Sequence, residues 1–183
     1  MIEIRGRVIV ITGASSGIGR ATAIECAREG MHVVVAARRK EKLDEVVEAC
    51  RSHGVDALGV ETDVTRPDDC VRLVDATLER FGSLYALYAN AGYGVEAPMH
   101  EMSEASLRAI FETNFWGSMH AIRPALEHMR RVGSGHILLC SSCLSKLGVP
   151  YYGAYCATKA CQDHVARAMR LELGGTGIHV SSV

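Results

Sequence analysis

Two hydrophobic patterns alternate along the chain. Six short stretches are almost continuously apolar and rich in β-branched residues, which is typical of strands buried on both faces of a parallel sheet. These predicted strands are residues 7–12, 32–37, 55–62, 84–92, 135–142 and 177–183. Between them, apolar positions recur at helical spacing and predict helices over residues 17–29, 41–52, 67–81, 102–131 and 151–173. The alternation predicts an α/β fold, a doubly wound parallel sheet with helices on both faces and right-handed crossovers.

The same pattern predicts a single domain over residues 1–183, because no linker, low-complexity tract or internal repeat interrupts it. Pro124 falls inside the longest predicted helix, and we expect a kink or weak point there. The sixth strand ends at Val183 with nothing after it to cover it. We therefore expect a domain that is truncated after this strand and lacks its C-terminal part.

Composition and charge exclude several classes of partner. Hydrophobic residues make up 48% of the chain, charged residues 22%, and the net charge is −1, so nothing attracts nucleic acid or an anionic membrane. The apolar runs are too short to span a bilayer, and the first strand starts too early to leave room for a signal peptide. Seven cysteines without framework spacing favour a reducing compartment. We expect a cytoplasmic protein.

A bare loop joins the first strand to the first helix. The segment "ITGASSGIGRA" carries Gly13, Gly17 and Gly19. Backbone N–H groups and the positive end of a helix dipole can meet a pyrophosphate at such a place. A Cβ at Gly13 or Gly17 would hold the phosphates away, and Gly19 lets the helix pack close to the strand. The loop therefore predicts a dinucleotide site, with a tight turn that binds nothing as the alternative.

A basic segment follows the second strand. In dinucleotide folds, an acidic residue at this place binds the adenosine ribose, but here "AARRKEK" offers Arg38 and Arg39. A guanidinium can clamp a 2′-phosphate, which a carboxylate would repel. We therefore predict NADP(H), with NAD(H) as the weaker alternative, and favour Arg38 because it lies nearer the strand end. The alternative interpretation is a solvated basic start of the next helix.

Two further segments carry candidate catalytic groups. "YCATK" places Tyr155 and Lys159 four residues apart near the start of a helix, and therefore on one face. Free tyrosine is a weak acid, and a nearby ammonium favours its phenolate, which suits general acid–base catalysis at neutral pH. "CSSC" ends the fifth strand, where open α/β sheets place their ligands. Ser141 or Ser142 would then lie at the mouth of the same site.

Together these motifs resemble the short-chain dehydrogenase/reductase (SDR) family, in its single-domain classical branch with a Rossmann fold. Thr12 and the three loop glycines match the family's TGxxxGxG element, and Ser142, Tyr155 and Lys159 match its catalytic serine and YxxxK pair. Further family motifs are matched by Asp63 in "TDV", by "NAG" at residues 90–92 and by Asn114 in "TNFWG". The resemblance runs over the entire chain.

The resemblance implies an NADP(H)-dependent interconversion of a small-molecule carbonyl and a secondary alcohol. Tyr155 would exchange a proton with the substrate oxygen, Lys159 would hold the nicotinamide ribose, and Ser142 would orient the carbonyl. Asn114 would bend its helix and hold a water that relays protons to Lys159. The implied cofactor-binding residues are Gly13, Ser15, Ser16, Gly17, Ile18, Gly19, Arg38, Asp63, Val64, Asn90, Ala91, Gly92, Tyr155 and Lys159.

The resemblance also implies a homodimer or homotetramer, formed through the long helix that contains Asn114 and the helix that contains Tyr155. Family members usually continue after the sixth strand with a segment that covers the nicotinamide and shapes the substrate pocket. Because this chain ends before such a segment, a non-catalytic NADP-binding regulatory protein with the same fold is the alternative function.

The cysteines raise a site of another class. Cys140 and Cys143 form a C-x-x-C, with Cys156 and Cys161 downstream, and zinc sites and redox pairs use such spacings. However, a strand end is not the helix start that activates a redox thiol, and the downstream spacing is unlike common zinc knuckles. The eight histidines show no HExxH or similar spacing. We therefore expect no metal, and cysteines that act as small apolar fillers.

Overall fold

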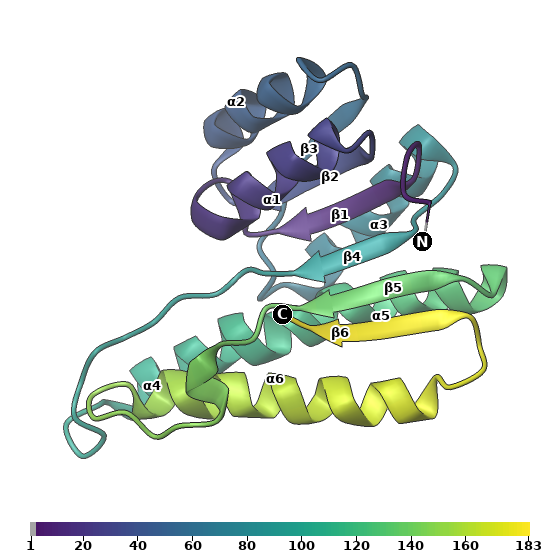
Figure 1. Cartoon of the computed structure of the whole chain (residues 1–183). Coiled ribbons are helices and arrows are strands. Elements are labelled where there is room, and N and C mark those ends of the chain that lie inside the picture. Colours follow the sequence, from purple (N-terminus) through teal and green to yellow (C-terminus); the bar gives the residue numbers. More distant parts are fainter. Residues whose placement is uncertain (1–2) are drawn as a thin grey trace.

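The computed structural model describes residues 3–183, which form a six-stranded parallel sheet between two layers of helices (Figure 1). The strands are β1 (Val8–Thr12), β2 (His32–Ala37), β3 (Ala57–Glu61), β4 (Ala86–Ala89), β5 (Gly135–Leu139) and β6 (Ile178–Ser182). Their spatial order is β3-β2-β1-β4-β5-β6, and every neighbouring pair is parallel. The predicted doubly wound α/β fold is confirmed. The predicted domain also includes residues 1 and 2, which lie outside the described range.

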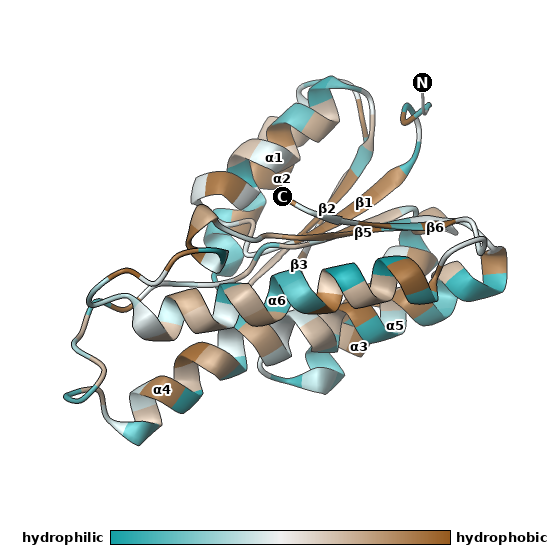
Figure 2. Ribbon diagram, turned by 60° about the horizontal axis from the view of Figure 1, so that its bottom comes forward, coloured by the Kyte–Doolittle hydropathy of each residue, from teal (hydrophilic) through white to brown (hydrophobic). Residues whose placement is uncertain are grey.

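Helices cover both faces of this sheet (Figure 2). They are α1 (Gly17–Arg28), α2 (Lys40–Arg51), α3 (Pro67–Phe81), α4 (Glu104–Phe111), α5 (Gly117–Val132) and α6 (Gly153–Glu172). Helices α1 and α2 pack on one face, and α3, α5 and α6 pack on the other. Because successive side chains of a strand point to opposite faces, Val10 and Val34 join the core under α3 and α5, while Ile11 and Val35 join the core under α1 and α2.

The long helix predicted over residues 102–131 is interrupted in the structure. A π-helical turn, Glu112–Trp116, separates α4 from α5, whereas α5 runs unbroken from Gly117 to Val132 with Pro124 inside it. The interruption is therefore not at Pro124 but around Asn114, which is buried and hydrogen-bonded both to the loop after β4 and to α6. Such π-turns often occur at functional sites.

The strand order places a crevice at the carboxyl ends of β1 and β4. From β1 the chain continues to β2 on one side, and from β4 it continues to β5 on the other side, so the two connections lead in opposite directions along the sheet. Thr12 joins these two ends, because its hydroxyl oxygen accepts hydrogen bonds of 3.1 Å from the backbone N–H groups of Asn90 and Ala91. The glycine loop after β1 and the "NAG" segment after β4 therefore lie side by side.

No helix within residues 3–183 is both long enough and apolar enough to cross a membrane.

Candidate active site

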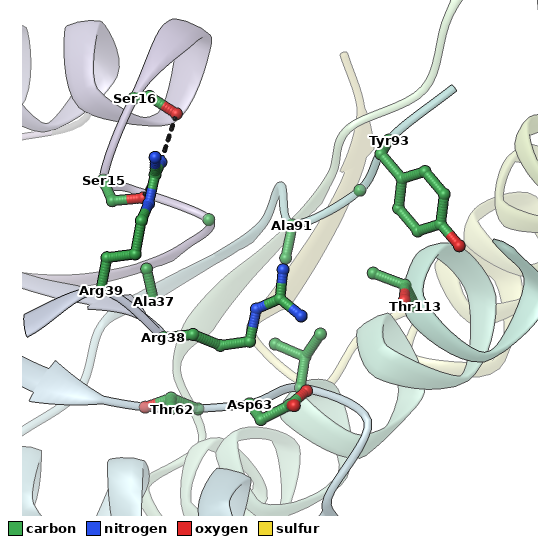
Figure 3. A pocket seen from close by; sticks show the side chains of 13 residues that line it. Ser15, Ser16, Ala37, Arg38, Arg39, Thr62, Asp63, Ala91, Tyr93 and Thr113 are labelled. Atoms are coloured by element: carbon green, nitrogen blue, oxygen red, sulfur yellow. Dashed lines mark hydrogen bonds between the residues drawn. The ribbon is translucent and has the colours of Figure 1, made fainter. Parts of the chain in front are cut away.

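Three neighbouring cavities along the carboxyl edge of the sheet contain most of the predicted site residues. The Arg38 cavity, of about 280 Å³, is lined by the predicted residues Gly13, Ser15, Ser16, Arg38, Asp63, Val64, Ala91 and Gly92 (Figure 3). The Tyr155 cavity, of about 470 Å³, shares four of these and adds Gly17, Ile18, Asn90, Tyr155 and Lys159. The Ser142 cavity, of about 790 Å³, is lined by Ser142 and also by Tyr155. Shared lining residues make the three cavities parts of one cleft.

The glycine loop has the geometry of an anion cradle. Gly13 has a φ of +68°, and a Cβ on it would lie 2.7 Å from the Cα of Ala91. Gly17 has a φ of +57°, and a Cβ there would meet nothing within 4 Å. Ser16, the N-cap of α1, makes no side-chain capping hydrogen bond, so the first N–H groups of α1 are not satisfied by their own cap. This combination of open backbone and helix N-terminus suits a pyrophosphate.

Gly19 lines none of the three cavities. A Cβ on Gly19 would lie 2.5 Å from the side-chain nitrogen of Asn90 and 2.7 Å from the carbonyl oxygen of Gly13. That nitrogen donates a hydrogen bond of 2.9 Å to the carbonyl oxygen of Thr12. Gly19 therefore leaves room for the Asn90 side chain, whose amide binds the backbone at the start of the glycine loop.

The two arginines after β2 are arranged differently (Figure 3). Arg39 donates from one nitrogen to the hydroxyl oxygens of Ser15, at 2.9 Å, and Ser16, at 3.1 Å. Arg38 makes no hydrogen bond or ion pair with any residue in the range 3–183, and its side chain lines the cavity that Ala91 and Asp63 also line. The cavity therefore has one arginine that is ordered by the glycine loop and one whose donors are available to a ligand. The sequence pattern alone did not assign Arg39 its contacts with the serines.

Asp63 is held by its neighbours at the end of β3. One oxygen of its carboxylate accepts hydrogen bonds from the backbone N–H and the hydroxyl of Thr65, at 3.0 and 2.8 Å. Its own N–H donates to the carboxylate of Asp69, at 3.0 Å. This hydrogen bond, assisted by Arg72, lowers the pKa of Asp69. The acidic pair therefore fixes the loop that forms one wall of the Arg38 cavity.

Tyr155 and Lys159 meet at the centre of the cleft. The Lys159 ammonium lies 5.6 Å from the centroid of the Tyr155 ring and donates a hydrogen bond of 2.7 Å to the carbonyl oxygen of Cys140. Lys159 is only 3% exposed, and this burial lowers its pKa. The predicted placement on one helix face thus brings the cation beside the phenol ring, at the edge of the sheet where β5 ends.

Ser142 follows β5 and caps a single 3₁₀ turn, η2 (Cys143–Ser145). Its hydroxyl oxygen accepts a hydrogen bond of 3.2 Å from the N–H of Leu144. Ser141 lines the same cavity as Ser142 and Tyr155. The choice of Ser142 over Ser141 as the substrate-facing serine therefore stays a prediction.

Asn114 lies beneath the cleft and lines none of the three cavities. Its side-chain amide donates to the carbonyl oxygen of Tyr93, at 2.9 Å, and to the Thr158 hydroxyl, at 3.1 Å, while its side-chain oxygen accepts from the N–H of Tyr93, at 3.0 Å. Its main-chain carbonyl accepts hydrogen bonds from Ser118 and Gln162. Asn114 thus ties the loop after β4 to the helix that carries Tyr155. Its role in holding a water near Lys159 stays a prediction.

Replacing Asn114 is expected to destabilise the fold. Asn114→Ala would remove two part-buried hydrogen bonds to the backbone of Tyr93 and a buried one to the Thr158 hydroxyl, so we expect the free energy of unfolding to fall by about 2–3 kcal/mol. Urea unfolding followed by circular dichroism measures this loss. Thr113→Ala, at the neighbouring position, is the control and should change stability by less than about 0.5 kcal/mol. Equal losses of stability in the two variants would contradict the conclusion that Asn114 links the loop after β4 to α6.

The cysteines and histidines form no recognisable metal site in the described part of the chain. No group of three or more His, Cys, Asp or Glu side chains within residues 3–183 could hold a metal ion, and all seven cysteines are free thiols. Burial raises the pKa of Cys26 to about 11 and that of Cys70 to about 12, so these thiols stay protonated at neutral pH.

Comparison with known proteins agrees with this geometry. The sequence pattern of the family described as short chain dehydrogenase matches residues 7–183. The 11-beta-hydroxysteroid dehydrogenase 1A of Arabidopsis thaliana is 42% identical over 97% of this chain and 51% of its own length. The chain therefore spans about half the length of this curated relative.

Two solved structures are also similar to this chain. A short chain dehydrogenase/reductase from Burkholderia phymatum in complex with NAD is 33% identical, with a TM-score of 0.96 over 100% of this chain and 66% of its own. An alcohol dehydrogenase from Thermococcus sibiricus complexed with 5-hydroxy-NADP is 30% identical, with a TM-score of 0.90 over 97% of this chain and 75% of its own. With the family pattern matched over nearly the whole sequence, the chain belongs to the short-chain dehydrogenase/reductase family.

Proposed function

We propose that this chain forms the cofactor-binding and catalytic part of an NADP(H)-dependent oxidoreductase that interconverts a carbonyl compound and a secondary alcohol. The observation that carries the proposal is the position of Tyr155. Its side chain lines both the cavity that holds buried Lys159 and the cavity that holds Ser142. A phenol between a cation and a serine hydroxyl, at the mouth of a dinucleotide cleft, suits proton transfer to a substrate oxygen.

The residues along the cleft fit a phosphorylated dinucleotide. The open backbone at Gly17 and the N-terminus of α1 suit the pyrophosphate, while Arg38 and Arg39 suit a 2′-phosphate. Asp63 and Val64 would flank the adenosine, and Lys159 would bind the ribose next to the nicotinamide. When bound, the cofactor supplies or accepts the hydride.

The protein's own groups then handle the proton and the substrate oxygen. Tyr155 donates its phenolic proton to the carbonyl oxygen during reduction and takes it back during alcohol oxidation. Ser142 donates a hydrogen bond to the same oxygen and stabilises the negative charge that develops on it. Lys159 keeps a positive charge beside the phenol ring. In the reducing direction the carbonyl carbon gains the hydride and the oxygen gains the Tyr155 proton, so the product is the alcohol.

Cofactor preference depends on Arg38 in this proposal. We expect the wild type to bind NADPH more tightly than NADH by about ten- to a hundredfold, since a hydrogen bond to a charged group contributes about 1.5–3 kcal/mol. Arg38→Asp should reverse the preference, because a carboxylate repels the 2′-phosphate and accepts hydrogen bonds from ribose hydroxyls. Titration of each cofactor against protein fluorescence gives the four dissociation constants.

The control for this prediction is Arg123→Asp, an equal change of charge at an exposed position of α5, on the other face of the sheet. It should leave the ratio of the two affinities unchanged. An unaltered ratio in Arg38→Asp would show that Arg38 does not recognise the phosphate. A reversal in Arg39→Asp alone would assign that role to Arg39.

Turnover is tested by NADPH oxidation with a panel of acetophenone, cyclohexanone, phenanthrenequinone and a ketosteroid. Apolar members of the panel are favoured because Leu144, Tyr93 and Tyr152 line the Tyr155 cavity, and because one relative is named a hydroxysteroid dehydrogenase. Cofactor binding without oxidation of NADPH by any member would overturn the catalytic proposal in favour of a non-catalytic NADP-binding regulatory protein. No observation in the structure favours that alternative.

Two expectations about the whole protein belong to the same proposal. We propose a homodimer or homotetramer, supported by a hollow on α4 and the π-turn, where Trp116, which is 44% exposed, lines the hollow together with Leu107, Phe111 and three charged side chains. Sedimentation equilibrium tests this, and a monomer would contradict it. The cytoplasmic location stays a prediction.

A further inference from the structure

A buried carboxylate outside the catalytic set joins three elements near Ser142. Asp163, on α6, is only 7% exposed. It forms ion pairs with Lys146, from the loop after β5, and with Arg167, at 3.2 Å, from its own helix. It also accepts a hydrogen bond of 2.9 Å from the hydroxyl of Ser182, in β6. A buried carboxylate with this many partners fixes the relative positions of the groups that it binds.

Of these partners, Lys146 is directly connected to Ser142. Ser142 is the N-cap of the single turn η2, and Lys146 is its C-cap. The turn is closed by three short-range bonds, in which Leu144 N–H donates to the Ser142 hydroxyl, Ser145 N–H to the Ser142 carbonyl and Lys146 N–H to the Cys143 carbonyl. Because the turn is so short, a restraint on Lys146 also restrains the Ser142 hydroxyl.

Helix α6 holds this segment at both ends. Lys159 donates to the Cys140 carbonyl, two residues before Ser142. Asp163, one helical turn after Lys159 and therefore on the same face of α6, binds Lys146, four residues after Ser142. The residues that carry Ser142 are thus attached at two points to the helix that carries Tyr155.

We propose that Asp163 is a positioning residue, which acts through Lys146 to hold the Ser142 hydroxyl in register with Tyr155. This inference rests on the proposed oxidoreductase function, because the register matters only if both hydroxyls meet one substrate oxygen. Small displacements of such groups are costly, since a shift of about 1 Å can reduce turnover about a hundredfold.

The two cations on Asp163 provide a matched pair of variants. Lys146 and Arg167 are similarly exposed, with 51% and 55% of their side chains accessible. Only Lys146 connects the Ser142 turn to α6, whereas Arg167 pairs with Asp163 within one helix. Lys146→Met and Arg167→Met therefore each remove one cation from the same carboxylate. Only Lys146→Met removes the ion pair that links the Ser142 turn to α6, which we call the tether.

The experiment measures kcat and KM with the fastest carbonyl of the panel, the NADPH dissociation constant, and the exchange rates of the backbone amides of residues 144–146. We expect Lys146→Met to lower kcat about ten- to a hundredfold and to speed amide exchange in the turn, with NADPH affinity unchanged. Arg167→Met should stay within about twofold of the wild type. Lys146→Arg, which keeps the cation, should restore kcat.

Two outcomes would overturn the proposal: an unchanged kcat in Lys146→Met, or an equal loss in Arg167→Met. If the wild type oxidises NADPH with no member of the panel, the proposed function fails. Amide exchange then still tests whether the ion pair of Lys146 with Asp163 restrains the Ser142 turn. Faster exchange at residues 144–146 in Lys146→Met alone would support it, and equal exchange in both Met variants would refute it.

Discussion

Tyr155→Phe is expected to bind NADPH as the wild type does and to turn over carbonyl substrates about a thousandfold more slowly, since a positioned general acid typically contributes 10²–10⁴-fold. The substitution removes only the phenolic oxygen. The ring keeps its place between the Tyr155 and Ser142 cavities, and Lys159 keeps its hydrogen bond to the Cys140 carbonyl. The expected loss therefore lies in kcat, measured by NADPH oxidation with the best substrate of the panel.

Tyr151→Phe is the control for this loss. Tyr151 is four residues before Tyr155, and its side chain is 55% exposed and lines none of the three cavities. Its variant loses the same atom and should keep kcat within about twofold, as surface changes usually do. If Tyr155→Phe also kept its turnover, another group would have to be the proton donor, and the catalytic assignment would be wrong.

The fold was predictable from the sequence because local rules are enough to specify it. Apolar strands such as residues 32–37 are buried on both faces, and the glycine loop falls between a strand and a helix. From these facts the parallel sheet and the position of its crevice follow. The four-residue spacing of Tyr155 and Lys159 likewise predicts that they share one face of a helix.

The contacts that support the cleft could not be predicted in the same way, because their partners are far apart along the chain. Asn114 meets Thr158 across 44 positions, and Arg39 meets Ser15 across 24. Lys146 and Asp163 are common surface residue types, and nothing in their spacing indicates that they form an ion pair or that the carboxylate is buried. Sequence periodicity reports on which face of its own element a residue lies, and it carries no information about the residue on the facing element.

The loop glycines illustrate the same limit. The sequence predicts that Gly13 and Gly17 leave room for phosphates and that Gly19 lets the helix pack closely. In the structure, Gly17 faces open space, Gly13 is pressed against Ala91, and Gly19 is pressed against Asn90. The close packing expected at Gly19 is therefore made with the Asn90 side chain, whereas the contact of Gly13 with Ala91 was not foreseen and adds a packing requirement between the loops after β1 and β4.

Gly13→Ala is therefore expected to damage both the fold and the cofactor site. Its φ of +68° strains any residue with a Cβ, and that Cβ would lie 2.7 Å from the Cα of Ala91. Strain and overlap together should lower the free energy of unfolding by about 2–5 kcal/mol. Because relief requires the glycine loop to move away from the "NAG" segment, NADPH affinity should also fall by at least about tenfold. Urea unfolding and cofactor titration measure the two effects.

Gly6→Ala separates strain from overlap. Gly6 has a similar φ of +73°, but a Cβ there meets nothing within 4 Å, so it should cost only about 1–2 kcal/mol and leave NADPH affinity unchanged. Equal destabilisation in the two variants would mean that the backbone at Ala91 yields without cost. The loops after β1 and β4 would then move independently, and Gly13 would be needed for its conformation alone. A larger loss in Gly13→Ala, accompanied by weaker NADPH binding, would mean that the contact between these two loops holds the dinucleotide cleft in shape.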